Sequence, residues 1–218
     1  MKPAPRKPAP AKSPSAAAKL AKAPHFVRII GGEWKRTRLA VADKAGLRPT
    51  PDRVRETLFN WLASLAGAGG GELPGWRCVD AFAGTGALGL EAASRGAESV
   101  LLCEQDAALV AQLQALKTKL SAEAVRVERG NGVSALERTP AGSLHVVFLD
   151  PPFDNAALYA PALSAAVRAL RPGGVIYLEA ARRWNEEELS PLDLVVYRHL
   201  KAGAVHAHLL RRATDTAA

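Results

Sequence analysis

The chain has 218 residues, of which 48% are apolar, with 29 Lys and Arg, 21 Asp and Glu and two cysteines. This apolar content is enough for one sizeable core, so disorder throughout the chain is excluded. Two cysteines cannot build a disulfide framework, no apolar run approaches the roughly 18 residues of a membrane span, and the basic N-terminus lacks the apolar region of a secretory signal. We expect a soluble, cytoplasmic protein.

The formal net charge of +8 is concentrated at the N-terminus. Residues 1–24 contain six basic residues and no acidic residue: Lys2, Arg6, Lys7, Lys12, Lys19 and Lys22. This tail, rich in Lys, Ala and Pro, is expected to be a disordered arm. It serves either solubility or a loose, sequence-independent attraction to phosphate. Beyond it, a net positive charge remains only in residues 25–61.

Residues 25–75 are expected to form a small N-terminal extension. Apolar residues before Gly31-Gly32 predict a strand, a tight turn and a second strand around Arg28–Arg38. The prolines at 49 and 51 keep the next stretch extended. Asp52 is predicted to cap a helix over Arg53–Ala66. Its apolar face is expected to consist of Val54, Leu58, Trp61, Leu62 and Leu65.

From residue 76 to 212, short apolar runs alternate with helical patterns. The expected strands are Cys78–Phe82, Val100–Cys103, Ala124–Val127, Leu144–Leu149 and Val175–Leu178. The expected helices are Ala87–Ser94, Ala107–Leu120, Asn131–Leu136 and Ala156–Leu170. This alternation predicts an α/β fold with a mostly parallel sheet. Two further strands, Leu192–Leu200 and Ala204–Leu210, are expected to close it as an antiparallel hairpin, with a disordered C-terminus at 213–218.

Ligands of such sheets bind beyond the carboxyl ends of the strands. After the first strand come Asp80, Phe82 and the run Gly84-Thr85-Gly86, with Gly89 completing a G-x-G-x-x-G pattern. Glu104 follows the second strand and suits a ribose diol. A nicotinamide enzyme would share these features. Asp80 would repel a pyrophosphate, however, and suits a cationic ligand such as the ammonium group of an amino acid.

Asp150-Pro151-Pro152-Phe153 follows the fourth strand. The Asp150 carboxylate and the Pro151 carbonyl could hold both N–H groups of a planar exocyclic amine and turn its lone pair toward an electrophile. The prolines fix the direction of that carbonyl, and Phe153 offers a flat surface for a flipped base. Proximity and orientation would then supply most of the catalysis.

Asp80-Ala-Phe-Ala-Gly-Thr-Gly together with Asp150-Pro-Pro-Phe resembles the class I S-adenosylmethionine-dependent amino-methyltransferases. The segments Arg28-Ile-Ile-Gly-Gly-Glu-Trp and Arg48-Pro-Thr-Pro-Asp-Arg-Val-Arg-Glu-Thr-Leu-Phe-Asn-Trp-Leu62 closely resemble the bacterial 16S rRNA guanine-N2 methyltransferases. The resemblance implies a Rossmann-like fold with a seven-stranded sheet. It also implies S-adenosylmethionine as cofactor and methyl transfer to a guanine N2 in 16S rRNA of the small ribosomal subunit.

The resemblance also implies site roles. The residues that would bind the cofactor are Asp80, Phe82, Gly84, Thr85, Gly86, Glu104, Asn131 and Gly132. Among them, Asn131 would contact the adenine amine. The residues that would hold the target guanine are Asp150, Pro151, Pro152 and Phe153. The residues that would contact RNA phosphates are Arg28, Lys35, Arg36, Arg38, Arg48, Arg53 and Arg55. The Arg48–Asp52 loop is expected over the cofactor pocket. We expect the protein to be a monomer. We also expect its RNA partner to present the target base already exposed.

Other interpretations are a DNA adenine-N6 methyltransferase with the same Asp150 motif, a nicotinamide oxidoreductase and a non-catalytic RNA-binding module. The first is disfavoured because no insertion is long enough for a target-recognition region. Glu179 is expected to form a structural salt bridge rather than to act as a second pocket acid. Trp34 and Trp61 are expected to be packing residues rather than base-stacking ones, and Cys78 and Cys103 are expected to lie in the core. The five histidines show no metal-ligand spacing.

Overall fold

The computed structural model describes residues 26–42, 50–67 and 69–216. Its centre is a seven-stranded sheet in the order β5-β4-β3-β6-β7-β9-β8. The strands are β3 (Arg77–Asp80), β4 (Ser99–Glu104), β5 (Val125–Arg129), β6 (Leu144–Leu149), β7 (Leu170–Ala180), β8 (Leu194–Ala202) and β9 (Val205–Arg212). Neighbours from β5 to β7 pair in parallel, and β9 pairs antiparallel with both β7 and β8. The predicted fold class and closing hairpin are confirmed.

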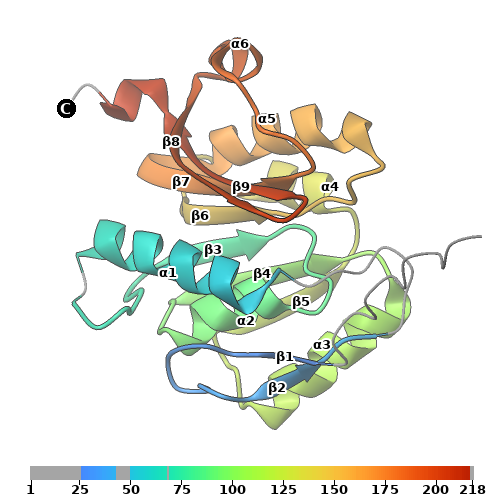
Figure 1. Ribbon diagram of the computed structural model, residues 1–218. Coiled ribbons are helices and arrows are strands. Elements are labelled where there is room, and N and C mark those ends of the chain that lie inside the picture. The colour runs from blue at the N-terminus through green and yellow to red at the C-terminus, as the bar shows by residue number, and fades with distance from the viewer. Residues whose placement is uncertain (1–25, 43–49, 68, 217–218) are drawn as a thin grey trace, which may run out of the picture.

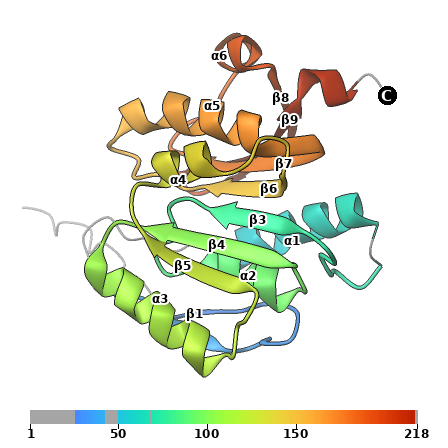
Figure 2. The ribbon, with the colours of Figure 1, turned by 180° about the vertical axis from the view of Figure 1, so that it is seen from behind.

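Helices cover both faces of the sheet, as its continuous apolar strands require. On one face lie α1 (Asp52–Ala66), α2 (Ala87–Ser94) and α3 (Ala107–Lys119) (Figure 1). On the other lie α4 (Gly132–Arg138), α5 (Tyr159–Ala169) and α6 (Glu186–Leu189) (Figure 2). Short 3₁₀ turns are η1 (Ala156–Leu158), η2 (Ser190–Leu192) and η3 (Ala213–Thr216). No helix within the described residues is long and apolar enough to cross a membrane.

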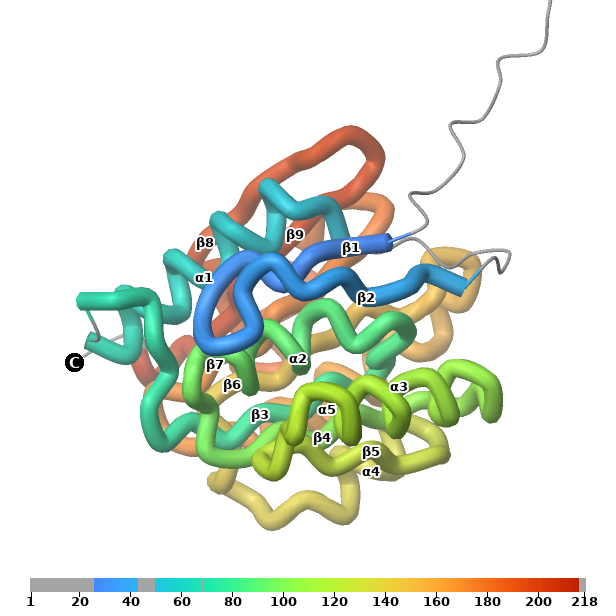
Figure 3. Tube along the Cα trace, turned by 90° about the horizontal axis from the view of Figure 1, so that it is seen from below, coloured from blue at the N-terminus to red at the C-terminus, as the bar shows by residue number. Residues whose placement is uncertain are grey.

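The N-terminal extension shares the core of the first face. Phe59 of α1 packs against Phe148 of β6 with ring centroids 6.0 Å apart, and Phe148 meets Tyr177 of β7 edge-on. The strands β1 (Phe26–Arg28) and β2 (Arg38–Ala40) form an antiparallel pair that lies beside α1 and α2 (Figure 3). Trp34 and Trp61 pack against this core, as predicted. The extension is therefore held to the sheet by shared apolar contacts.

The predicted hairpin of β1 and β2 is present, but its connection, residues 29–37, is longer than the predicted tight turn. Ile29 still bonds across to Arg36 and Thr37, but the backbone N–H groups of Ile30 and Gly31 donate to Glu91 of α2. Glu33 N donates to the Ser94 carbonyl, and Trp34 N donates to Ser94 Oγ. A Cβ on Gly32, whose φ is +74°, would lie 1.8 Å from the Ser94 carbonyl oxygen, so this close approach requires glycine.

The ends of two other segments also differ from prediction. Pro51 is the N-cap residue of α1, and Asp52 lies in the first turn, where its carboxylate pairs with arginines instead of capping. Leu65 is exposed, and Phe59 and Ala63 take part in the buried face. Residues Ala213–Thr216, expected to be disordered, form η3, in which Asp215 accepts a hydrogen bond from Gly173 N. The tail 1–24 and Arg48 lie outside the described residues.

Candidate active site

Three carboxylates meet at the carboxyl edge of three adjacent strands. Asp80 ends β3, Asp150 directly follows β6, and Glu179 lies near the end of β7. The register pairs Asp80 with Phe148 and Leu149 with Leu178, so Asp150 comes next to Glu179. Burial raises the pKa of Asp150 well above its ordinary value, and the charges of Glu179 and Asp80 raise it further. This edge therefore favours ligands that bring positive charge or N–H donors.

Asp80 is only partly satisfied by the protein. Its Oδ2 accepts a hydrogen bond of 3.0 Å from Gly89 N in α2, while Oδ1 is buried and has no partner among the described residues. Burial, followed by the charges of Glu104 and Glu179, raises its pKa to about 7, although the N–H groups of Gly89 and Phe82 act in the other direction. A buried, unpaired carboxylate oxygen fits an ammonium donor.

The glycine run bends sharply between β3 and α2. Gly84 and Gly86 have φ of +51° and +77°, and Gly86 precedes the first residue of α2. A Cβ on Gly86 would lie 2.6 Å from a methyl carbon of Leu113 in α3. The bend thus requires glycine and brings the backbone to the strand edge, where a ligand can approach it. Phe82 is half-buried and Thr85 is buried beside this run.

Glu104, at the end of β4, is oriented by two backbone donors. Gly84 N donates to Oε2 at 2.9 Å, and Asp106 N donates to Oε1 at 2.8 Å. Each carboxylate oxygen has a second lone pair, so both can still accept from ligand hydroxyls. The bond to Gly84 N places the carboxylate directly against the glycine run.

Asn131 and Gly132 stand at the start of α4. Asn131 is the N-cap residue: its Oδ1 accepts from Val133 N at 2.8 Å and from Ser134 N at 3.2 Å. The side-chain oxygen that was expected to accept from an adenine amine is thus engaged in capping, and the amide NH₂ is the group left for a ligand. A Cβ on Gly132 would lie 1.9 Å from the Ala81 carbonyl oxygen, so glycine permits α4 to approach β3.

Asp150-Pro151-Pro152-Phe153 leaves β6 toward the same edge. Pro151 is buried, Pro152 is exposed and the Phe153 ring is 40% exposed. Among the described residues, neither the Asp150 carboxylate nor the Pro151 carbonyl accepts a hydrogen bond. Two acceptors next to a free aromatic ring form a place for a planar base that carries an amine.

Glu179 forms no salt bridge in the described part of the chain, contrary to expectation. Its Oε1 accepts from the Thr50 hydroxyl at 2.6 Å and from the Tyr177 hydroxyl at 2.8 Å. Thr50 belongs to the segment before α1, and this bond attaches that segment to the strand edge. The described part of the predicted 48–52 loop therefore reaches the end of β7.

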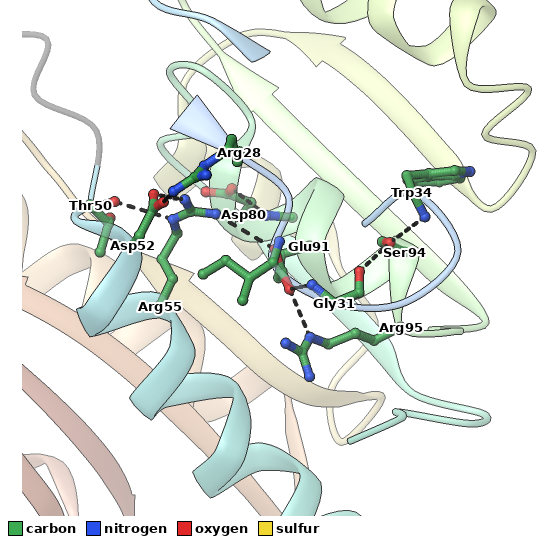
Figure 4. Close-up of polar contacts among 12 residues, drawn as sticks. Arg28, Gly31, Trp34, Thr50, Asp52, Arg55, Asp80, Glu91, Ser94 and Arg95 are labelled. Atoms are coloured by element: carbon green, nitrogen blue, oxygen red, sulfur yellow. Dashed lines mark hydrogen bonds and ion pairs between the residues drawn. The ribbon is translucent and has the colours of Figure 1, made fainter. Parts of the chain in front are cut away.

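Glu91 was not singled out from the sequence, yet it joins the extension to the site (Figure 4). The fully buried carboxylate accepts from Ile30 N at 2.7 Å and from Gly31 N at 2.8 Å. It also pairs with Arg95 at 2.8 Å and lies 3.6 Å from Nη1 of Arg55. The available signal was a single charged residue in the otherwise apolar and small sequence of α2.

The basic residues of the extension divide into two groups. Arg28, Lys35, Arg36, Arg38 and Arg53 are exposed. Arg55 is fully buried, donates to the Thr50 carbonyl and pairs with Asp52 at 2.6 Å, so its predicted contact with RNA phosphate is corrected to a structural role.

A cavity of about 530 Å³ lies between β1, β2 and the segment Thr50–Asp52. Arg28 and Arg38 line it, and the Arg38 guanidinium stacks 4.4 Å above the Phe26 ring.

A family model described as "Conserved hypothetical protein 95" matches residues 27–211. The Escherichia coli K12 protein named ribosomal RNA small subunit methyltransferase D is 39% identical over 85% of this chain and 90% of its own length. The Haemophilus influenzae protein of the same name is 42% identical over 84% of this chain and 92% of its own. The chain belongs to this methyltransferase family. The solved structure of Escherichia coli yhhF, 34% identical, gives a TM-score of 0.70 and covers 86% of this chain and 98% of its own.

Membership of this family agrees with the predicted resemblance and identifies the protein as a methyltransferase. The matched region runs from β1 through most of β9, so it includes both the extension and the sheet. In open sheets of this kind, ligands bind beyond the carboxyl ends of the strands, which is where Asp80, Asp150 and Glu179 lie.

Proposed function

We propose that the protein transfers a methyl group from S-adenosylmethionine to the exocyclic N2 of a guanine in 16S rRNA of the small ribosomal subunit. The observation that carries this proposal is the uncommitted pair of acceptors, Asp150 carboxylate and Pro151 carbonyl, beside the exposed Phe153 ring. The relatives' names, which refer to ribosomal RNA of the small subunit, support the substrate class. We place the reaction in the cytoplasm and the protein in a monomeric state.

The acceptors would act on the amine as follows. The N2 lone pair of guanine is delocalised into the ring and is a poor nucleophile. If Asp150 and Pro151 each accept one N2–H, the nitrogen becomes pyramidal and its lone pair points at the methyl donor. As the new N–C bond forms, N2 must lose one of its two protons, and the Asp150 carboxylate would accept it. Phe153 would stack on the flipped base and Pro152 would keep the carbonyl in place. Orientation of this kind is the main contribution to rate that these residues can make.

The cofactor residues fit S-adenosylmethionine, which supplies an electrophilic methyl group on a sulfonium centre. The unpaired Asp80 Oδ1 suits the ammonium of its methionine part. The glycine run with Phe82 and Thr85 borders the same space, and Glu104 suits the ribose hydroxyls. Gly132 and Asn131 would border the adenine, and the Asn131 NH₂, which does not take part in capping α4, would donate to a ring nitrogen.

The cofactor site should be sensitive to pH through Asp80. An ammonium pairs with the ionised carboxylate, whereas the unliganded protein holds the carboxyl with a pKa of about 7. Below this pKa, binding must release a proton, so affinity for S-adenosylhomocysteine should fall about tenfold between pH 8 and pH 6. Titration calorimetry over this range measures the change. Asp80→Asn should bind weakly at every pH with a flat profile; an unchanged slope in this variant would assign the effect to another group.

The exposed arginines and lysine of the extension would contact RNA phosphate. Arg28, Arg38 and Arg53 stand around the cavity and the start of α1, close to the strand edge. Lys35 and Arg36 lie on the connection between β1 and β2. Arg48 is assigned the same role from sequence. Phosphate contacts position an RNA without reading its sequence.

The deciding experiment uses methyl-labelled S-adenosylmethionine and small ribosomal subunits from cells that lack this protein. The RNA is digested to nucleosides after the reaction. The expected product is N2-methylguanosine. Label in any other nucleoside, or in N6-methyladenine of added DNA, would contradict the proposal. Protein-free 16S rRNA in a parallel reaction tests whether the base must be presented by an assembled particle.

A further inference from the structure

Glu179 is a buried acid for which the proposed mechanism has no role. It is 2% exposed and stands next to Asp150 at the end of neighbouring parallel strands. Tyr177 and Glu179 are two residues apart in β7 and therefore project from the same face, where the Tyr177 ring packs on Phe148. This is also the face that α1 covers, so Glu179 lies under the segment that begins with Thr50.

The hydrogen bonds of Glu179 leave one oxygen free. Both hydroxyl donors, from Thr50 and Tyr177, bond to Oε1. Within the described residues, Oε2 accepts no hydrogen bond. Because the two hydroxyls fix the carboxylate through one oxygen, the other is held as an acceptor in a defined direction. A carboxylate with no counterion in hydrogen-bond contact is costly to bury, unless a ligand supplies the missing donor.

The local charges also favour a ligand that donates hydrogen bonds at this strand edge. Asp80, Asp150 and Glu179 come from three adjacent strands, and burial raises the pKa of each. The guanidinium of Arg55 lowers the pKa of Glu179, as do the two hydroxyl bonds, but burial outweighs them. The ammonium and sulfonium of a bound cofactor would account for positive charge near Asp80. The Asp150 carboxylate, which follows β6, and Oε2 of Glu179 in β7 still lack donors among the described residues.

The hydrogen-bonding edge of guanine supplies these donors. It presents N1–H directly beside the N2 amine, two donor groups in a row. Adenine and cytosine present a ring nitrogen lone pair next to their amine, which a carboxylate would repel. We infer that Glu179 Oε2 accepts the N1–H of the target guanine while Asp150 and Pro151 hold its N2 amine, so that Glu179 determines the specificity for guanine. This inference rests on the proposed function.

The test removes the N1–H of the base. Small subunits are reconstituted with 16S rRNA ligated from fragments that carry either guanine or 2-aminopurine at the methylated position. 2-Aminopurine keeps the 2-amine but has a lone pair at N1 in place of the N1–H, and it also lacks the O6 oxygen. Wild-type protein should show a kcat/KM at least about tenfold higher for guanine. In Glu179→Gln, the amide oxygen should take the two hydroxyl bonds and turn its NH₂ toward the base, so the ratio should fall to about one or invert.

The comparison of ratios between variants cancels the intrinsic difference in reactivity between the two bases and any contribution of O6, because neither depends on the side chain at 179. Tyr177→Phe is the matched control, because it removes one hydroxyl bond but leaves the carboxylate, and it should retain the preference for guanine. Thermal unfolding and S-adenosylhomocysteine binding verify that each variant is folded. The wild-type comparison itself needs no variant.

Each outcome has a distinct meaning. Equal use of both bases by the wild type, or an unchanged ratio in Glu179→Gln, would overturn the role of Glu179 and leave the proposed function intact. Failure of the wild type to methylate the guanine substrate at N2 would instead overturn the proposed function. A collapse of the ratio only in Glu179→Gln is the expected result.

Discussion

Asp150→Ala is expected to lower methyl transfer about 100- to 1000-fold while S-adenosylhomocysteine binds nearly as before. Alanine removes one of the two acceptors that orient the amine, and the remaining Pro151 carbonyl cannot hold both N–H groups. Asp80, the glycine run and Glu104 are unchanged, so the cofactor site persists. Single-turnover methylation of small subunits and calorimetric titration with S-adenosylhomocysteine measure the two effects separately.

A stability loss cannot mimic this result. Burial and the charge of Glu179 raise the pKa of Asp150, which means that the ionised carboxylate is disfavoured in the fold. Its removal should leave the melting temperature equal or higher. Asp154→Ala is the matched control, since Asp154 is an exposed acid on the same loop. Activity within a few-fold of wild type in Asp150→Ala would exclude the orienting mechanism.

Glu91→Gln is expected to reduce the free energy of unfolding by about 3–5 kcal/mol. Both carboxylate oxygens accept backbone N–H groups, from Ile30 and Gly31, and an amide would turn a donor toward one of them. The guanidinium of Arg55, fully buried, and that of Arg95, 8% exposed, would lose their shared counterion. Urea denaturation measures the change, and a melting temperature lower by about 2–4 °C per kcal/mol should accompany it.

Glu56→Gln provides the comparison for this prediction. Glu56 is an exposed acid on α1, next to Arg55 in sequence, and its replacement should change the unfolding free energy by no more than about 0.5 kcal/mol. A similarly small effect for Glu91→Gln would show that the buried carboxylate is not what fastens the extension to α2.

The elements of the sheet could be predicted from the sequence because their signals are local. Leu144–Leu149 and Ala87–Ser94 agree with prediction to the residue, since apolar runs and glycine boundaries define them. The connection between β1 and β2 could not be predicted in this way. Its backbone donors bond to Glu91 and Ser94, some 60 residues away, and such partners leave no trace in local sequence.

Some residues of the site could likewise be placed from the sequence, and others could not. The positions of Asp80, Glu104 and Asp150 at strand ends follow from the order of strands. The burial of Arg55 does not, because Arg53 and Arg55 look alike in sequence and only the packing of α1 distinguishes them. The partners of Glu179 depend on Thr50, which lies 129 residues earlier in the chain.

The contact between Phe59 and Phe148 can form only after most of the chain has been synthesised. The ribosome synthesises α1 early, but the strands that bury its apolar face, β6 and β7, come on the order of ten seconds later at ordinary rates of translation. The part of α1 that packs on β6 and β7 therefore lacks these partners through much of the synthesis. Products that terminate before Tyr177 should never bury that helix fully, and cellular proteases should remove them.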